Sequence, residues 1–227
     1  MFYYLNMQVS ENTIDNILKY KNYRLIILSK VFPNSYMNFS FVETIGNGSC
    51  FFECVGKCFP EFNKIVKYNN TTQIIRICVA KKIYEYNENT QKVIQYWKEM
   101  WKMAKESNDE QLMKEYYQVK DIENIPDCQK LSDIHLEKIV SFILTNNFWA
   151  EEFSIRTICE ELNLCFIIVD EISKKIQPSI YYKLNKYTNY IIVYLDSCSH
   201  YTLLSYKNIL RFKNENLPPF INNNLND

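Results

Sequence analysis

This sequence contains few glycines, few histidines and no net charge, and these features limit the functions that the protein can have. The 227 residues include three glycines and two histidines, and 26 Lys and Arg residues balance 26 Asp and Glu residues. A net charge of zero gives no support to nucleic-acid binding, which usually needs a basic surface. Any reaction that requires an imidazole must use His135 or His200.

Long apolar runs are missing too. No stretch reaches the roughly 20 apolar residues that cross a bilayer. Polar side chains interrupt the first twenty residues, so no secretory signal is visible. We therefore expect a cytoplasmic protein, placed in the host cytoplasm if the source is a virus or an intracellular parasite. The eight cysteines would then be mostly free thiols.

The apolar spacing predicts an α+β fold, with helices packed on a small sheet. Steps of three and four residues predict helices over 11–31, 73–86, 91–118 (with a break at 107–109), 133–144 and 154–162. Short β-branched runs predict buried strands over 165–169, 190–194 and 201–205, and a further apolar piece covers 39–45. We expect a helical extension over 1–36, a main domain over 37–212 and a flexible tail over 213–227.

The clearest chemical signal is a cysteine directly after a glycine-rich turn. Gly46-Asn47-Gly48-Ser49 leads into Cys50, which opens a predicted helix. The N-terminus of a helix presents unpaired N–H groups and a partial positive charge. These would stabilise a thiolate, and the loop amides could hold the oxyanion of a tetrahedral intermediate. A buried structural cysteine after a turn is the alternative interpretation.

A cysteine nucleophile needs a base, and the two histidines differ in their surroundings. His135 lies beside Asp133 and Glu137 in a charged helical stretch, which indicates a solvated position. His200 lies in a turn between two predicted strands, where catalytic groups are often placed. His200 is therefore the better candidate, although a turn histidine without a function fits the same pattern.

Four segments in order resemble the ovarian-tumour (OTU) family of cysteine peptidases. Residues 46–52 are similar to the family's G-D-G-x-C-[LF]-[FY] box, and the helix around Arg76 resembles the helix that follows it. The segment from Trp149 to Val169 resembles the Trp-Gly segment and its strand. The run 190–194 and the pair His200-Tyr201 match the closing strand and the His-Tyr box. The resemblance covers about residues 41–206.

The resemblance implies an OTU-type papain-like fold and a deubiquitinase. Such an enzyme hydrolyses the isopeptide or thioester bond after the C-terminal glycine of ubiquitin or a ubiquitin-like modifier. Cys50 would attack the carbonyl and His200 would transfer the proton. No cofactor and no metal are implied. The expected partners are ubiquitin or polyubiquitin chains, with no nucleic acid and no membrane, and we expect a monomer.

The resemblance also assigns roles around this pair. Asn47 stands where the family usually has Asp, and Thr202 stands where many members place the Asp or Asn that orients the histidine. Glu43, Asn47 and Asp196 are alternative orienting residues. The expected substrate-binding residues are Gly48, Ser49, Trp149, Glu151, Glu152 and Tyr201, and the two glutamates would pair with arginines of the ubiquitin tail.

The departures from the family pattern at Asn47, Ala150 and Thr202 keep alternatives open. One is a catalytically inactive OTU fold that binds ubiquitin. Another is an unrelated papain-like peptidase. Because both Cys50 and His200 are present, an active enzyme is favoured.

Two further patterns allow more than one interpretation. Cys50, Cys54 and Cys58 recur every four residues, but no second pair is spaced to complete a zinc site, so we expect Cys54 to pack in the core. Trp97, Met100 and Trp101 form an aromatic stripe at helical spacing. That stripe is either core or a surface that contacts ubiquitin.

Overall fold

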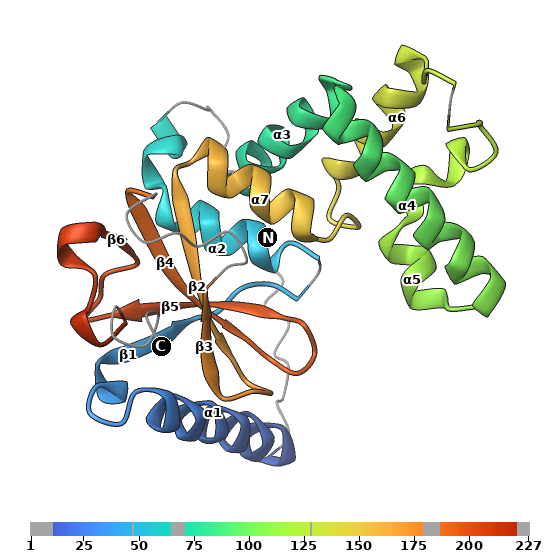
Figure 1. The fold of residues 1–227 in the computed structure, drawn as a ribbon. Helices are drawn as coiled ribbons and strands as arrows, with labels where there is room; N and C mark the ends of the chain where they lie inside the picture. Colours follow the sequence, from blue (N-terminus) through green and yellow to red (C-terminus); the bar gives the residue numbers. More distant parts are fainter. Residues whose placement is uncertain (1–10, 47, 65–70, 128, 179–186, 222–227) are drawn as a thin grey trace, which may run out of the picture.

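A six-stranded sheet lies at the centre of the computed structural model, which describes residues 11–46, 48–64, 71–127, 129–178 and 187–221 (Figure 1). Its strands are β1 (Phe39–Val42), β2 (Leu164–Asp170), β3 (Lys175–Pro178), β4 (Asn189–Leu195), β5 (Tyr201–Tyr206) and β6 (Arg211–Lys213). The strand order is β1-β5-β4-β2-β3, and β6 pairs with the first half of β4. β2 and β4 run parallel, whereas the other paired strands are antiparallel.

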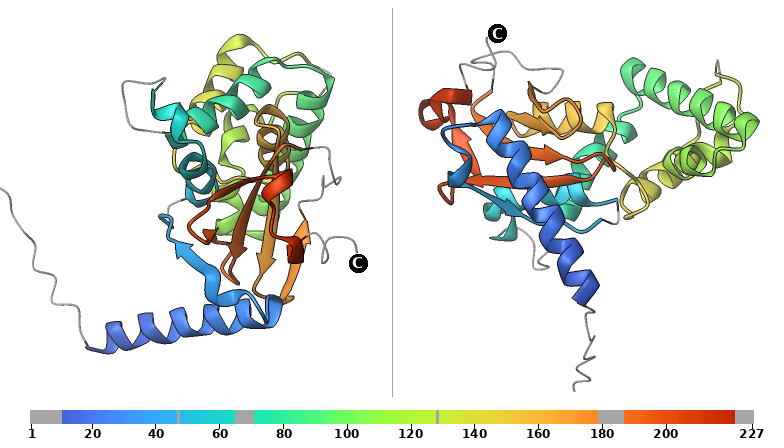
Figure 2. Two further views of the ribbon diagram at one scale, coloured as in Figure 1. Left: turned by 90° about the vertical axis from the view of Figure 1, so that its left-hand side faces the viewer. Right: turned by 90° about the horizontal axis from the view of Figure 1, so that it is seen from below.

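Helices surround this sheet. They are α1 (Glu11–Val31), α2 (Cys50–Cys58), α3 (Thr71–Tyr84), α4 (Glu88–Ser107), α5 (Glu110–Glu115), α6 (Asp133–Ile143) and α7 (Glu152–Glu161). Short 3-10 helices cover Tyr36–Asn38, Pro60–Lys64, Tyr117–Ile122 and Asn214–Asn216. α2 packs against β4 and β5, and α7 packs against β2. α1 lies on the opposite side of the sheet, while α4, α5 and α6 form a helical lobe beyond α3 (Figures 1 and 2).

The α+β fold class expected from the sequence is confirmed. β2 and β4 are covered on both faces, which explains why their sequences are continuous apolar runs rather than alternating ones. The break expected at 107–109 is present, because Asn108 adopts a left-handed conformation (φ 54°) at the end of α4 and Asp109 caps α5. None of the described helices has the length and apolar character needed to cross a membrane.

The aromatic stripe of α4 belongs to the core, so its interpretation as an exposed binding surface is wrong. The exposed fraction of Trp97 is 0% and that of Trp101 is 6%. Trp97 meets the rings of Phe148 and Phe153 edge-on, at centroid distances of 6.1 and 6.2 Å. The apolar face of α4 therefore points into the molecule, as is usual for an amphipathic helix.

The two ends of the described chain add to the same core. Ile27 and Leu28 of α1 are fully buried, and so is Ile221 near the C-terminus. Phe220 lies edge-on to Phe32, with 5.2 Å between the ring centroids. Residues 213–221, which were expected to belong to a flexible tail, thus include side chains packed in the core.

Candidate active site

The loop before α2 requires glycine at position 48. Gly48 has a φ of +82°, a conformation that residues with a side chain rarely adopt. A Cβ atom there would also collide with the carbonyl of Asn146 and would lie 2.6 Å from Nε1 of Trp149. Trp149 therefore packs directly on the loop that carries Cys50. Asn47 lies outside the described residues.

Arg76 of α3 holds this loop from inside the protein. The side chain is fully buried and lies over the ring of Phe52. Nη2 donates to the carbonyl of Gly48 (3.2 Å) and to Oγ of Ser49 (3.1 Å), and Nη1 donates to the carbonyls of Ile143 and Phe148 (2.9 and 3.0 Å). A planar guanidinium can make these bonds at once, which a lysine could not. One side chain thus ties the loop that carries Cys50 to the segment that leads to Trp149.

Ser49 is the N-cap residue of α2, yet its hydroxyl makes no capping hydrogen bond. Instead, Oγ donates to Oδ1 of Asn146 (3.0 Å) and accepts from Arg76. Ser49 therefore does not use its side chain to cover the first N–H groups of α2, which are orphaned at the start of any α-helix. Those groups flank Cys50 and are suited to hold a negatively charged oxygen.

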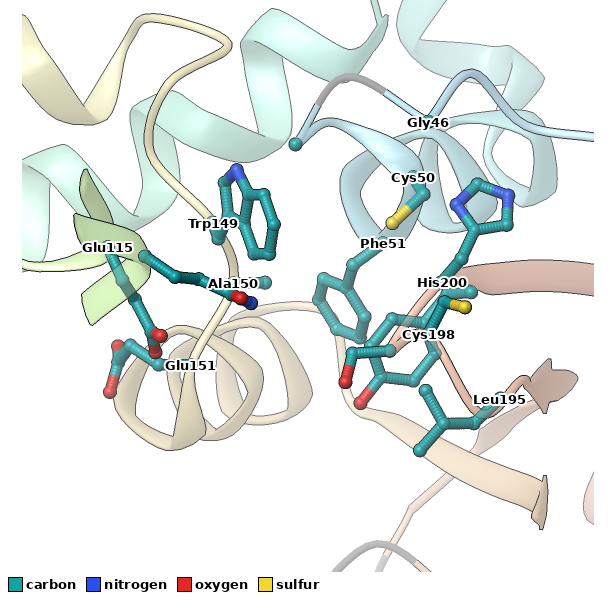
Figure 3. Close-up of a pocket in the computed structure, with 14 residues that line it drawn as sticks. Gly46, Cys50, Phe51, Glu115, Trp149, Ala150, Glu151, Leu195, Cys198 and His200 are labelled. Atoms are coloured by element: carbon teal, nitrogen blue, oxygen red, sulfur yellow. The ribbon is translucent and has the colours of Figure 1, made fainter. Parts of the chain in front are cut away.

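The ring of His200 faces Cys50 (Figure 3), and its far nitrogen contacts Thr44. Nε2 of His200 lies 3.2 Å from Oγ1 of Thr44, and that hydroxyl donates its only proton to the carbonyl of Tyr201 (2.5 Å). Towards His200, Oγ1 can therefore only accept, so Nε2 carries the ring proton of the neutral imidazole. Nδ1, on the side of Cys50 and Gly46, is left as an unprotonated base.

Burial has the largest effect on the pKa of the Cys50 thiol. It raises the pKa of Cys50, whereas backbone N–H groups of Tyr201, Phe51 and Cys50 itself act to lower that pKa. The helix N-terminus thus acts in the expected direction but does not outweigh desolvation. A thiol in this state depends on a neighbouring base to become a nucleophile.

The hydroxyl that contacts the ring of His200 belongs to Thr44 and not, as expected, to Thr202. Thr202 is buried in β5 and makes no hydrogen bond to the described His200 ring, because it belongs to the strand that follows and Thr44 occupies the position beside Nε2. Oδ1 of Asp196 accepts a hydrogen bond from the backbone N–H of His200 at 2.9 Å, so this carboxylate bonds to the backbone of the turn and not to the imidazole ring. The carboxylate of Glu43 accepts hydrogen bonds from Nη1 and Nη2 of Arg24.

A pocket surrounds the Cys50–His200 pair. Trp149, with 44% of its surface exposed, forms one wall, and Tyr201 and Glu151 also line it (Figure 3). The carboxylate oxygens of Glu151 accept the N–H groups of Phe153 and Ser154, each at 2.9 Å, so Glu151 caps α7. Glu152 is exposed and is not among the lining residues.

Sequence reasoning missed two polar residues of this pocket. Gln111 and Glu115 of α5 reach it from the helical lobe, and burial raises the pKa of Glu115. The described lining residues include no Lys and no Arg. The pocket is thus acidic on the side facing α5. Nothing in the local sequence of α5 marks Glu115, because only the fold brings it beside Trp149.

Cys54 and His135 do not line this pocket, whereas Cys198 does. Cys54 is buried as expected, with Sγ 3.7 Å from the carbonyl of Tyr201. His135 lies in the first turn of α6, with Nδ1 3.0 Å from Oγ of Ser132. Across the described ranges, no group of three or more His, Cys, Asp or Glu side chains could hold a metal ion.

Replacing Thr44 by Val should lower the rate of a reaction that depends on His200 by about tenfold, the effect of one lost orienting hydrogen bond. Thr44→Ser, which keeps the hydroxyl, should retain most of the rate. The matched control is Thr202→Val, which removes a hydroxyl that does not contact the ring. The rate at which iodoacetamide alkylates Cys50 at neutral pH checks this. A larger loss in Thr202→Val than in Thr44→Val at equal stability would contradict the assignment.

Neither a protein-family model nor a curated protein matches the chain. Among solved structures it is similar to an OTU domain in complex with ubiquitin, at 15% identity over 82% of this chain and 80% of that chain, with a TM-score of 0.48. It is also similar to an OTU deubiquitinase from Wolbachia pipientis wMel (13% identity, 76% and 91% covered, TM-score 0.41). The Hazara virus OTU bound to ubiquitin aligns at 11% identity, with 74% and 81% covered and a TM-score of 0.39.

Proposed function

We propose that this protein is a cysteine peptidase of the OTU type, which hydrolyses the bond after the C-terminal glycine of ubiquitin or a ubiquitin-like modifier. One observation carries the proposal. Cys50 and His200 face each other across one pocket, and the hydrogen bond that Nε2 of His200 donates to Thr44 leaves Nδ1 unprotonated on the side of the thiol. The motif resemblance around Cys50, Trp149 and His200 supplies the choice of substrate.

The proposed reaction uses groups that the site already holds. Nδ1 of His200 takes the proton of the Cys50 thiol while Sγ attacks the scissile carbonyl. The N–H groups at the start of α2 hold the oxyanion. His200 then gives the proton to the leaving lysine amine, and a thioester remains on Cys50. Water, deprotonated by His200, attacks the thioester and releases the free carboxylate and the thiol.

A ubiquitin carrying a thiol-reactive warhead at its C-terminus tests the proposal. The native protein should form an adduct of one ubiquitin per chain, and excess unmodified ubiquitin should compete with the reaction. Peptide mass spectrometry should locate the bond on Cys50. A folded protein that forms no such adduct, or forms it equally with a warhead that lacks ubiquitin, would overturn the assignment.

A second candidate function is ubiquitin binding without catalysis. Two observations favour it: burial raises the pKa of Cys50, and a neutral hydroxyl on Thr44, rather than a carboxylate, orients His200. A carboxylate would stabilise an imidazolium more strongly. Measurable binding of unmodified ubiquitin without adduct formation would select this candidate over the peptidase.

The acidic side of the pocket leads to a prediction about substrate affinity. Glu115 is half-buried and lines a pocket without basic residues in its described wall, so it can pair with an arginine of the ubiquitin tail. Glu115→Gln should raise KM for ubiquitin chains about fivefold, with kcat nearly unchanged, because a partly exposed ion pair contributes about 1 kcal/mol. Glu137→Gln, an exposed change on α6, is the control. A fall in kcat at unchanged KM would count against this role.

A further inference from the structure

Helix α1 contacts both segments that flank the ring of His200. The hydroxyl of Tyr20 donates to Oδ2 of Asp196 at 2.9 Å. Arg24, one turn further along α1, donates to the two carboxylate oxygens of Glu43, at 3.2 and 2.5 Å. Asp196 begins the turn that carries His200, and Glu43 directly precedes Thr44, which contacts Nε2 of that histidine.

The carboxylate of Asp196 sets the shape of the His200 turn. Its Oδ1 accepts the N–H groups of Cys198 and His200, both at 2.9 Å, while its Oδ2 accepts from Tyr20. The backbone N–H of Asp196 also donates to the carbonyl of His200 (3.1 Å), and Ser199 adopts a left-handed φ of 61°. A turn built around one carboxylate changes shape when that carboxylate rotates, and the Tyr20 hydroxyl opposes this rotation.

Arg24 fixes α1 against the end of β1. Only 6% of its surface is exposed, and its guanidinium lies over the rings of Phe41 (4.1 Å) and Tyr20 (4.8 Å). The Arg24 side chain thus packs on Tyr20 and binds the carboxylate of Glu43. Burial, together with the bond to Asp196, raises the pKa of Tyr20 well above its ordinary value, so the phenol remains a proton donor throughout the neutral range.

We propose that Tyr20 and Arg24 are positioning residues for the base: α1 fixes the angle at which His200 faces Cys50, through Asp196 on one side and Glu43–Thr44 on the other. The inference rests on the proposed Cys–His chemistry and goes beyond the motifs that suggested it. Neither residue lines the pocket around Cys50. We therefore expect these two residues to affect how well His200 activates the Cys50 thiol and not how tightly substrate binds.

The test measures alkylation of Cys50 by iodoacetamide as a function of pH, located on Cys50 by peptide mass spectrometry. A small reagent makes the result independent of ubiquitin binding. His200→Ala gives the profile of the thiol without its base. Tyr20→Phe, which removes one oxygen, should lower the neutral-pH rate by about two- to tenfold towards that of His200→Ala, the range expected for one lost hydrogen bond. The alkaline rate, at which the thiol ionises unaided, should not change.

Tyr23→Phe is the matched control, since Tyr23 is exposed on the same helix and should leave the profile unchanged. Besides His200, the charged and titratable groups near Cys50 include Glu53, Cys54, Arg76, Tyr201 and the pocket glutamates, and those near Tyr20 include Arg24, Glu171, Tyr194 and Asp196. They are the same in Tyr20→Phe, Tyr23→Phe and the wild type. A difference between the profiles of Tyr20→Phe and the wild type therefore reports on the position of His200.

The outcomes separate this inference from the proposed function. A Tyr20→Phe profile equal to wild type, while His200→Ala differs, overturns the inference alone. A His200→Ala profile equal to wild type overturns the Cys–His pair and the inference with it. Loss of thermal stability in Tyr20→Phe without a change in the neutral-to-alkaline rate ratio assigns α1 a purely structural role, which also overturns the inference. If Tyr20→Phe does not fold, Arg24→Lys, which keeps the charge but not the forked pair, is judged by the same ratio.

Discussion

Replacing Cys50 by Ala should abolish covalent labelling by the ubiquitin probe and cleavage of ubiquitin chains, because the variant lacks the sulfur that we propose as the nucleophile. Loss of a catalytic nucleophile leaves at most the weak catalysis of the remaining site, several orders of magnitude below wild type. The change removes one half-buried sulfur, so the protein should fold normally. Far-UV circular dichroism and the melting temperature check the fold beside the kinetics.

Two of the other described thiols, Cys54 and Cys58, are poorly suited to replace Cys50. Burial raises the pKa of Cys54 well above its ordinary value and that of Cys58 to about 12, so both remain protonated at neutral pH. Since the folded-state pKa of Cys58 is raised, ionising this thiol at high pH would destabilise the fold rather than produce a stable nucleophile. Cys198 is exposed beside the pocket, which makes Cys198→Ala the matched control. That control should keep full labelling.

The result that would contradict the assignment is a folded Cys50→Ala protein that still forms the ubiquitin adduct. Location of that adduct on Cys198 would show that the probe reports exposure rather than catalysis. Retained chain cleavage in Cys50→Ala would exclude Cys50 as the nucleophile altogether.

The sequence predicted most helices and the central strands because each has a strong local pattern of apolar residues. The apolar runs of β2 and β4 and the three- and four-residue steps of α1 and α4 persist long enough to be recognised. β3 and β6 were missed, since they span only four and three residues and take their stability from pairing with β2 and β4. Their structure is set by tertiary contacts that no local pattern records.

The same division holds at the site. Cys50 and His200 could be proposed from local turns and motif resemblance, and the pocket brings them together. Thr44 could not, because its role depends on the pairing of β1 with β5. That register aligns Val42 with Leu203, and its continuation places Thr44 beside Tyr201 and thus next to His200. A motif that places the orienting residue two positions after the histidine predicts Thr202 instead.

Arg76 shows how much of the site's support is invisible in the sequence. The resemblance marked its helix, but the partners of the side chain, Gly48, Ser49 and Phe148, come from two separate segments of the chain. A buried arginine at a helical position would ordinarily be judged unfavourable without a partner. Here burial lowers its pKa to about 10, which still leaves it charged at neutral pH. Its partners are carbonyl and hydroxyl oxygens that only the assembled fold provides.

Replacing Trp97 by Ala should destabilise the protein by about 3–5 kcal/mol, the usual cost of removing a large buried aromatic side chain. Trp97 is fully buried and contacts Phe148 and Phe153, which lie on either side of Trp149 in the sequence. In a chain of this size, each kcal/mol lowers the melting temperature by roughly 2–4 °C, so the expected fall is about 10 °C. Because a typical domain is stable by only about 5–15 kcal/mol, a substantial unfolded population can follow.

The same change should lower activity through stability and loop position rather than through lost contact with ubiquitin. Phe148 supplies a carbonyl to Arg76, and Arg76 holds the loop of Cys50, so a cavity at Trp97 can displace the site. Trp97→Phe should retain most of the stability, and it removes an indole N–H that has no hydrogen-bond partner in the described structure. Met103→Ala, an exposed change on the same helix, should alter neither property. If Trp97→Ala melted like wild type while KM for ubiquitin chains rose, the stripe would be a binding surface and its assignment to the core would fail.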